Sequence, residues 1–270
     1  MKTPQKSSNM TAMNYLANVK LRPGSMDQAV LDEMKQDVYH VRKLVRTGDT
    51  VLDIGAYTGL FALSIKDVCP GARVVSVEPE PENYAALQEN IRGTDVLAVN
   101  VALVGEPGVV TLKNYGLEAS ACHSIFDLTP GEGEFISVEG ITLSQLLEKY
   151  EIQAIRVLKL DCQGAEFDIL SAASRELLAR IDFISMEVHW AIADTRRILG
   201  KIPDFENKRE RMYRNLYSTH LPVLGNIGQD SMQLWSNRRL LPFWRRASGD
   251  VQRALRSSVR WARRVVRRAR

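Results

Sequence analysis

The sequence predicts an α/β fold whose strands form a largely parallel sheet. The chain has 270 residues, of which 45% are hydrophobic, and this is enough for a full core. Between residues 50 and 101, short β-favouring runs alternate with helical runs, as in parallel sheets. The apolar run from Val51 to Ile54 leads into Gly55 and Gly59, which is typical of a strand, a tight turn and a helix N-terminus.

Hydrophobic spacing and flanking turn residues predict the individual elements. The expected strands are 50–54, 73–77, 96–101, 109–112, 135–138, 155–160, 181–188, 221–227 and 231–235. The expected helices are 26–41, 58–68, 81–91, 142–150, 164–178 and 205–216. The last two strands are separated by a turn and are consistent with a closing antiparallel pair. The chain therefore divides into a flexible N-terminal segment (1–24), one domain (25–237) and a tail (238–270).

Charge is distributed unevenly along the chain. Residues 238–270 contain twelve arginines, no lysine and one acid, Asp250, which gives a net charge of +11. Residues 1–237 carry 24 basic and 31 acidic residues, a net charge of −7. The basic character is thus confined to the tail, which argues against nucleic-acid binding by the body. The three cysteines lack metal or redox spacing, and no apolar run suits a signal peptide or membrane span, so we expect a cytoplasmic protein.

The tail has the pattern of a basic amphipathic helix. Apolar residues recur at helical spacing among the arginines, at Val251, Leu255, Val259, Ala262 and Val266. Together with the apolar stretch 240–244, this pattern is typical of a segment that contacts an anionic membrane, here at its inner face. A solvated tail, or one lying on the acidic body of its own or a sister subunit, is the alternative. RNA contact is a third possibility, although repeated arginines alone do not recognise a specific nucleotide sequence.

A nucleoside site is indicated at the ends of the first two expected strands. Asp53 lies beside the glycine turn, and Glu78 at the end of the second strand can bind both hydroxyls of a ribose. The spacing from Gly55 to Gly59 is neither G-x-G-x-x-G nor a P-loop, which disfavours a pyrophosphate. A nucleoside carrying a small zwitterion fits better, with its carboxylate at the turn and its ammonium group facing Asp53. S-adenosylmethionine matches this description; the alternative is that both acids only cap helices.

Six segments between about Thr47 and Trp190 carry a family resemblance. They are Val51–Gly59, Val77–Asn90, Asn100–Leu103, Ile141–Leu147, Val157–Leu170 and Ser185–His189. In this order they resemble the FkbM-type methyltransferases, class I enzymes that use S-adenosylmethionine, and the stretch from Lys159 to Glu166 is the most specific to that family. The resemblance implies a Rossmann-like, doubly wound, mostly parallel seven-stranded sheet with an antiparallel last strand. It also implies methyl transfer, usually to a hydroxyl.

The glycine turn and the resemblance together assign the cofactor site. The residues expected there are Asp53, Gly55, Ala56, Tyr57, Thr58, Gly59, Glu78, Pro79, Asn100 and Ala102. Tyr57 stands where the family usually has Asn, and this difference could alter how the amino-acid end of the cofactor is held.

Methyl transfer to a hydroxyl needs oxygen, methyl carbon and sulfur in line, and a base nearby is useful. Candidates for catalysis lie at the ends of the fourth and fifth expected strands: Asp161, Glu187 and His189. Because these strands should be neighbours, Asp161 and Glu187 can face one pocket, and His189 could take a proton near neutral pH. Gln163 stands where the family often has Glu, so we do not expect the base at that position.

Three further residues are assigned to the acceptor: His123, in the Gly-rich loop 116–133, Lys159 and Glu166. Each has a structural alternative. Lys159 could pair with Glu187, Glu166 could cap its own helix, and a lone histidine is more often structural. Asp161 and Glu187 lack an obvious third ligand, so the sequence predicts no metal site.

The glycine turn and the resemblance predict an S-adenosylmethionine-dependent O-methyltransferase, and the resemblance implies that its acceptor is a sugar, a glycan or a natural-product intermediate. Two other classes remain open. One is a non-catalytic cofactor-binding or membrane-associated scaffold. The other is a nucleotide-dependent oxidoreductase, which the missing G-x-G-x-x-G disfavours.

Overall fold

A large sheet runs through the middle of the molecule. A computed structural model of the chain describes residues 14–126, 133–189, 205–224 and 232–240. Its seven-stranded sheet has the order β3-β2-β1-β7-β8-β10-β9. The strands are β1 (Thr50–Ile54), β2 (Arg73–Val77), β3 (Leu97–Val99), β7 (Ile155–Leu160), β8 (Ile181–Glu187), β9 (His220–Leu224) and β10 (Met232–Asn237). The pairs are parallel except that β10 runs antiparallel to β8 and β9, so the predicted fold class is confirmed.

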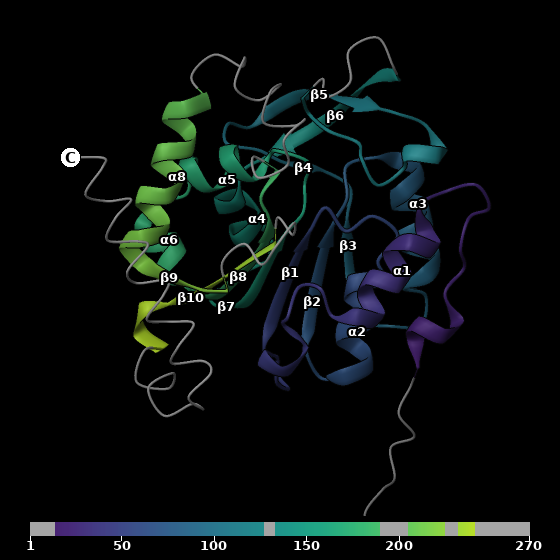
Figure 1. Cartoon of the computed structure of the whole chain (residues 1–270), viewed down its shortest axis with the longest axis horizontal. Coiled ribbons are helices and arrows are strands. Elements are labelled where there is room, and N and C mark those ends of the chain that lie inside the picture. Colours follow the sequence, from purple (N-terminus) through teal and green to yellow (C-terminus); the bar gives the residue numbers. More distant parts are fainter. Residues whose placement is uncertain (1–13, 127–132, 190–204, 225–231, 241–270) are drawn as a thin grey trace, which may run out of the picture.

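Helices cover both faces of this sheet, which gives the molecule three layers (Figure 1). One face carries α1 (Asp27–Gln36), α2 (Leu60–Val68) and α3 (Pro81–Asn90); the other carries α4 (Leu143–Lys149), α5 (Glu166–Ala172), α6 (Arg175–Ala179) and α8 (Phe205–Thr219). Val51 and Val157 pack with the first set of helices, whereas Leu52 and Leu158 pack with the second. Successive strand residues point to opposite faces, so both faces of the central strands are buried, as parallel sheets require.

The strand order reverses between β1 and β7. From β1 the sheet continues to β2 and β3, whereas from β7 it continues to β8. The helices after these two strands, α2 and α5, lie on opposite faces. In such sheets ligands bind in the crevice at the carboxyl ends of the strands, where the order reverses. Gly55 directly follows β1 and Asp161 directly follows β7, so both lie at this point.

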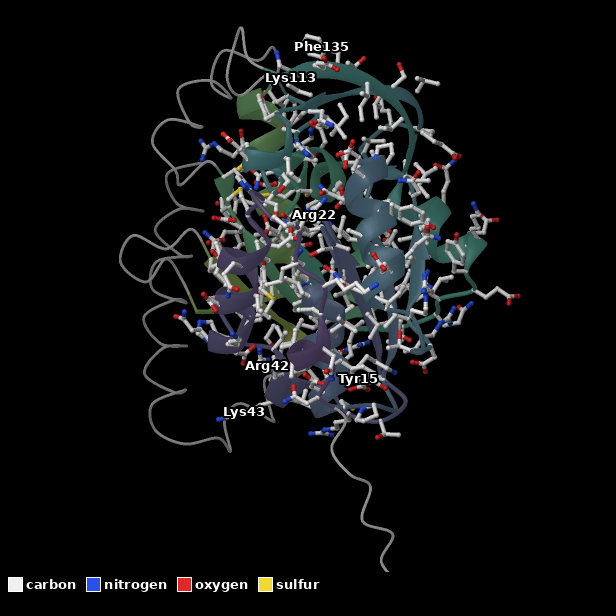
Figure 2. The ribbon with its side chains drawn as sticks, turned by 90° about the vertical axis from the view of Figure 1, so that its right-hand side faces the viewer. Tyr15, Arg22, Arg42, Lys43, Lys113 and Phe135 are labelled. Carbon is white, nitrogen blue, oxygen red and sulfur yellow. The ribbon has the colours of Figure 1, made fainter. Side chains whose placement is uncertain are left out.

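A smaller sheet follows the carboxyl end of β3. It has the order β4-β6-β5, formed by β4 (Ala102–Leu103), β5 (Gly108–Asn114) and β6 (Glu134–Ile141). The Lys113 Nζ lies 4.3 Å from the ring centroid of Phe135, and Figure 2 shows this pair at the opposite end of the molecule from Arg42 and Lys43. The two extra strands that the sequence predicted are present and longer than expected, because their antiparallel pairing continues through polar residues.

Three elements differ from the prediction for local reasons. Helix α1 ends five residues early, because Asp37 adopts a left-handed conformation. The helix expected over 164–178 is two helices, since Ser174 has an extended backbone and caps α6 by accepting the N–H of Leu177 at 3.1 Å. Strand β3 is short, and the chain then moves to the small sheet as β4.

The N-terminal segment packs against the body from residue 14 onward. The 3-10 helix η1 (Tyr15–Asn18) donates two backbone N–H groups to the Asp67 carboxylate, and Lys20 N–H donates to the Asn90 side chain at 2.8 Å. The sequence predicts a flexible segment over 1–24, whereas Tyr15, Leu16 and Lys20 make these contacts. Residues 1–13 lie outside the described part of the chain.

The tail lies almost entirely outside the described residues. Arg238–Leu240 form the 3-10 helix η5, and the predicted amphipathic helix falls within 241–270, which the structure does not describe. The turn between the last two expected strands (228–230) and the adjoining strand ends also lie outside, within 225–231, although β9 and β10 pair as expected. Two further 3-10 helices are η2 (Arg42–Leu44) and η3 (Leu117–Ala119).

Within the described ranges, no helix is long and apolar enough to cross a membrane.

Candidate active site

The turn after β1 brings its backbone against the end of β7. Gly55 and Ala56 both donate their N–H groups to the Val77 carbonyl at 3.0 Å, and Gly55 has a φ of 73°. A Cβ at Gly55 would lie 1.8 Å from the carbonyl oxygen of Asp161, so only glycine fits here. The predicted glycine turn therefore has a steric cause, the close approach of two strand ends.

Lys159 supports this turn from within the sheet. Its Nζ donates to the Gly55 carbonyl at 2.6 Å and lies 3.2 Å from Asp53 Oδ1, with both side chains buried. Burial raises the pKa of Asp53, although the Lys159 ammonium opposes this shift. Asp53 does not line the cavity, in contrast to the expected contact with the ammonium group of the cofactor. Lys159, expected at the acceptor, instead uses its charge to hold Asp53 and the turn.

Glu78 lies at the end of β2 with its carboxylate in the cavity wall. It accepts hydrogen bonds from the backbone N–H groups of Tyr57 at 2.8 Å and Glu80 at 3.1 Å. Burial raises the pKa of Glu78 to about 7, against the lowering effect of these donors. Asn100 donates its side-chain amide to the carbonyls of Glu78 and Pro79, at 2.8 and 3.1 Å. Asn100 thus supports the end of β2 from outside the cavity, whereas it was expected to bind the cofactor.

Tyr57 joins three distant segments of the chain. Its φ of 52° is a left-handed conformation that bulky side chains seldom adopt. The phenol donates to the Asp27 carboxylate and lies 2.7 Å from the Ser120 hydroxyl. Arg22, labelled in Figure 2, pairs with Asp27 at 2.8 Å and lies 5.1 Å from the Tyr57 ring centroid. This Tyr57 network (Arg22, Asp27, Tyr57 and Ser120) ties α1 and the residue after η3 to the glycine turn.

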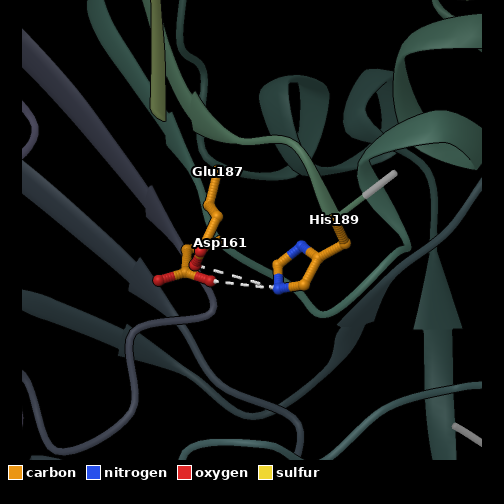
Figure 3. A group of neighbouring side chains, drawn as sticks. All are labelled: Asp161, Glu187 and His189. Atoms are coloured by element: carbon orange, nitrogen blue, oxygen red, sulfur yellow. Dashed lines mark ion pairs between the residues drawn. The ribbon is translucent and has the colours of Figure 1, made fainter. Parts of the chain in front are cut away.

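The carboxyl ends of β7 and β8 bring the three expected catalytic side chains together (Figure 3). Asp161 follows β7, Glu187 ends β8, and His189 lies two residues further on. The His189 Nε2 is 4.0 Å from Asp161 Oδ1 and 3.8 Å from Glu187 Oε2. One nitrogen or oxygen atom from each residue lies within 4.8 Å of those of the other two. The sequence expected no third ligand beside the two carboxylates, and His189 occupies that position.

Glu166 orients the imidazole of this cluster. Its Oε1 accepts the backbone N–H of His189 at 3.0 Å and lies 3.0 Å from His189 Nδ1. Its Oε2 accepts the N–H of Gly164 at 2.9 Å. Glu166, expected at the acceptor, is fully buried and does not line the cavity. It fixes the ring so that Nε2 points toward Asp161 and Glu187.

Negative charge dominates the cluster. Burial alone would lower the pKa of His189, but the carboxylates of Glu166, Glu187 and Asp161 raise it to about 9. Burial alone would raise the pKa of Asp161, but the charges of Lys159 and His189 outweigh it and lower that pKa. In the molecule as it stands, the imidazole is therefore protonated at neutral pH, which disfavours the expected proton uptake by His189.

Tyr39 is a residue of the site that sequence reasoning missed. Its phenol donates to Asp161 Oδ2 at 2.6 Å, and Lys159 Nζ lies 5.3 Å from its ring centroid. Tyr39 follows α1 in a stretch without a strand pattern or a motif, so no signal pointed to it. Asp27 and Arg22 were missed for the same reason, since they also precede the first motif.

A cavity open to solvent contains both ends of the site. The predicted residues that line it are Gly55, Ala56, Tyr57, Glu78, Pro79, Ala102, His123, Lys159, Asp161 and Glu187. The predicted residues outside its lining are Asp53, Thr58, Gly59, Asn100, Glu166 and His189. The Nδ1 of His123 accepts the N–H of Tyr115 at 3.1 Å, and burial lowers the pKa of His123 to about 4. His123 is therefore neutral at neutral pH and adds no positive charge to the cavity.

The sheet, the glycine turn and the acid after β2 define the class of this protein. It is a Rossmann-like methyltransferase, and S-adenosylmethionine is its cofactor. The family described as "Methyltransferase FkbM domain" matches residues 53–217, more than half of the chain. The chain belongs to this family, which confirms the resemblance seen in the sequence.

Individual relatives are distant. The 31-O-demethyl-FK506 methyltransferase FkbM of Streptomyces tacrolimicus is 27% identical over 187 residues, which cover 58% of this chain and 70% of the relative. The hexuronic acid methyltransferase AglP of Haloferax volcanii is 26% identical over 159 residues, which cover 57% of this chain and 62% of the relative. A solved O-methyltransferase from Bacillus cereus in complex with SAH shares 14% identity, with a TM-score of 0.43, over 83% of this chain and 86% of that one.

The residues of the cavity fit S-adenosylmethionine. The turn at Gly55 leaves its backbone uncovered by any Cβ, as close approach of a ligand requires. Glu33, Glu78, Asp161 and Glu187 line the cavity, whereas Lys159, the one lysine among its described lining residues, is paired with Asp53. An acid-lined cavity complements the positive sulfonium of this cofactor.

Proposed function

We propose that the chain is an O-methyltransferase that acts on a hydroxyl of a sugar, a glycan or a natural-product intermediate. The observation that carries this proposal is a cavity with the glycine turn and Glu78 at one end and Asp161 and Glu187 at the other. The names of the two relatives mention a 31-O-demethyl compound and a hexuronic acid, which supports an oxygen acceptor. Bound S-adenosylmethionine supplies an activated methyl group; the protein has to position it and the acceptor.

At the cofactor end, Glu78 would bind the ribose hydroxyls through the carboxylate that faces the cavity. The backbone from Gly55 to Tyr57 would hold the amino-acid end, and Pro79 with Ala102 would flank the nucleoside. Asp53 would act indirectly, because its charge holds Lys159 and Lys159 holds the turn.

At the acceptor end, Asp161 and Glu187 would bind the acceptor hydroxyl, because they are the members of the cluster that line the cavity. In the transfer a C–O bond would replace the C–S bond of the cofactor, and the hydroxyl proton would leave to water past Asp161 and Glu187. His189 would position the two carboxylates, since it lies behind them and is held by Glu166. His123 would contact the acceptor from the loop between β5 and β6.

Ligand binding is the first test. We expect S-adenosylmethionine and S-adenosylhomocysteine to raise the melting temperature of the full chain, and NAD to leave it unchanged. At a hundredfold excess over Kd, a ligand adds about 2.7 kcal/mol to the free energy of unfolding. No shift with either adenosyl compound would contradict the proposal, and a shift with NAD alone would favour an oxidoreductase.

Turnover is the second test. Labelled methyl transfer to a panel of sugars, glycans and natural-product alcohols should give a product whose methyl group lies on oxygen by mass spectrometry. Binding of the cofactor without transfer to any acceptor would favour the non-catalytic alternative. The two ends should respond separately to mutation: Glu78→Gln should weaken S-adenosylhomocysteine binding by about 2 kcal/mol, because hydrogen bonds to a charged group are lost. His189→Ala should leave that affinity unchanged and slow the transfer.

A further inference from the structure

We propose that Asp161, Glu187 and His189 bind a divalent cation such as Mn²⁺ or Zn²⁺. One imidazole and two carboxylates are a donor set that these cations accept. Cation binding itself does not depend on the function proposed above, whereas the role of the cation in the reaction rests on that function.

The spacing of the three side chains suits a shared cation. Two atoms bound to one cation at about 2.2 Å lie at most about 4.4 Å apart. The His189 Nε2 meets this limit with Asp161 Oδ1 at 4.0 Å and with Glu187 Oε2 at 3.8 Å. The three ligand atoms lie within 4.8 Å of one another, so side-chain shifts of about half an ångström would complete the site. Figure 3 shows the ring nitrogen directed between the two carboxylates.

The histidine is held in the manner of a metal ligand. Metal-binding histidines almost always use the second ring nitrogen in a hydrogen bond to a carboxylate or carbonyl, which fixes the tautomer and the orientation. Here Nδ1 faces Glu166 Oε1 at 3.0 Å, and the same oxygen accepts the backbone N–H of His189. The ring is 2% exposed, so its direction is set by this contact rather than by solvent.

An oxygen of the cluster also lacks a hydrogen bond. Asp161 Oδ2 accepts the phenol of Tyr39, whereas no described group donates a hydrogen bond to the buried Asp161 Oδ1 as long as Glu187 is ionised. A buried carboxylate oxygen without a donor is costly and calls for an explanation. This is the oxygen that faces His189 Nε2, so a cation between the two would satisfy it.

Charge favours a cation over a neutral ligand at this place. The carboxylates around the cluster are Glu33, Asp53, Asp161, Glu166 and Glu187, against one lysine and one imidazole among the described residues. Because Lys159 is paired with Asp53 and His189 with Glu166, Asp161 and Glu187 bring a charge of −2, which a divalent cation would balance as it displaces the Nε2 proton of His189. A cation bound here would lower the pKa of an acceptor hydroxyl that it contacts, so that water could take the proton.

Binding of Mn²⁺ to the full chain, without a histidine tag and stripped with EDTA, tests the proposal directly. The electron paramagnetic resonance signal of free Mn²⁺ reports binding without cofactor or activity. The wild type should bind one Mn²⁺ per chain, and Asp161→Asn and Glu187→Gln should each weaken binding at least tenfold. Glu106→Gln, an exposed acid between β4 and β5, is the matched control and should bind as the wild type does.

Two further measurements sharpen the result. Zn²⁺ should displace Mn²⁺, whereas Ca²⁺ should compete poorly, because it prefers six to eight oxygen ligands. Glu166→Gln should weaken binding by about tenfold to a hundredfold without touching the cation, since it loosens the histidine. Circular dichroism shows which variants are folded; Glu187, partly exposed, provides the test if Asp161→Asn does not fold.

No stoichiometric Mn²⁺ in the wild type, or unchanged binding in folded Glu187→Gln, would overturn the cation site. Thermal shift with S-adenosylhomocysteine on the same samples separates this outcome from the proposed function. A shift without Mn²⁺ binding would refute the cation and leave the methyltransferase proposal standing. Mn²⁺ binding without a shift would support the cation site and refute the cofactor site.

Discussion

The two ends of the cavity are built from different parts of the chain. At the ends of β1 and β2, the cavity is lined by the turn from residue 55 to 57 and by one acidic residue, Glu78. At the ends of β7 and β8 they are the side chains of Asp161 and Glu187, backed by His189. A site made of backbone depends on steric fit at fixed positions. A site made of side chains can change one residue at a time.

Strand β7 connects the two ends. It carries Lys159, which holds Asp53 and the turn at Gly55, and it leads directly into Asp161 at the acceptor end. The cofactor end therefore relies on an ion pair inside the sheet, and this ion pair is where a single change should have the largest effect.

Lys159→Met would leave Asp53 buried without its partner. We expect the free energy of unfolding to fall by about 4 kcal/mol, because breaking a buried ion pair leaves an uncompensated charge. Adding Asp53→Asn should recover part of the loss, since neither charge is then buried. Urea unfolding measures both variants. An unchanged midpoint of urea unfolding together with a raised KM for the acceptor would mean that Lys159 binds the acceptor. It would then not support the turn, and the two ends of the cavity would not differ in the way described.

Glu78 should make stability depend on pH. Burial raises its pKa to about 7 from the ordinary 4.5, with Glu80 and Lys159 as the charged groups that act on it. Between these values the folded protein keeps a proton that the unfolded chain has lost, so stability falls as pH rises from 4.5 through 7. The loss is about 3 kcal/mol at most. Glu78→Gln should flatten this part of the curve in urea unfolding at a series of pH values; an identical slope in both proteins would argue against a buried Glu78.

Alanine substitutions at two glycines with similar φ values distinguish the cost of backbone strain from the cost of steric overlap. Gly55 and Gly93 have φ values of 73° and 84°, but a Cβ at Gly93 would meet nothing within 4 Å. Gly93→Ala should cost about 1 kcal/mol through its backbone alone. Gly55→Ala should cost about 2 kcal/mol more, because it also pushes β1 away from Asp161. Equal losses in thermal unfolding would show that the two strand ends are not in close contact.

The smallest effect is expected at the Tyr57 network. Tyr57→Phe removes the hydrogen bonds of a phenol to Asp27 and Ser120 and should cost about 1 kcal/mol, since Asp27 keeps its pair with Arg22. Tyr84→Phe is the matched control, because its hydroxyl makes only long contacts, 3.5 Å to the Ala98 carbonyl and 3.3 Å to the exposed Gln88 amide, and should matter little. Losses of the same size in chemical unfolding would mean that the network does not hold α1.

The sequence was most informative where a motif occupies one continuous stretch. Val51–Gly59 and the acid at Glu78 could be recognised because a strand, a turn and a helix follow each other without interruption. The fold followed from apolar runs of the right length. The break before α6 was missed because Ser174 is only a weak helix stop in a sequence that is otherwise apolar on one face.

Pairing between side chains on different strands could not be read in the same way. Asp53 and Lys159 are direct neighbours in the parallel register of β1 and β7, and that register becomes visible only in the structure. Glu166 was assigned to the acceptor because it lies near a strand end, yet it binds His189. Tyr39 was missed because its position depends on how the segment after α1 packs against the sheet.

The family match covers fewer residues than the folded domain contains. The family match covers 53–217, but β10 lies outside it and sits between β8 and β9 in the sheet. Asp27 and Tyr39 also lie outside, and each donates or accepts a hydrogen bond at the edge of the cavity. A fragment cut at the bounds of the family match would lack an interior strand and the hydrogen bonds of Asp27 to Tyr57 and of Tyr39 to Asp161. Shortened versions of this enzyme should therefore keep every strand of the sheet, and their ends should not be set by the bounds of the family match.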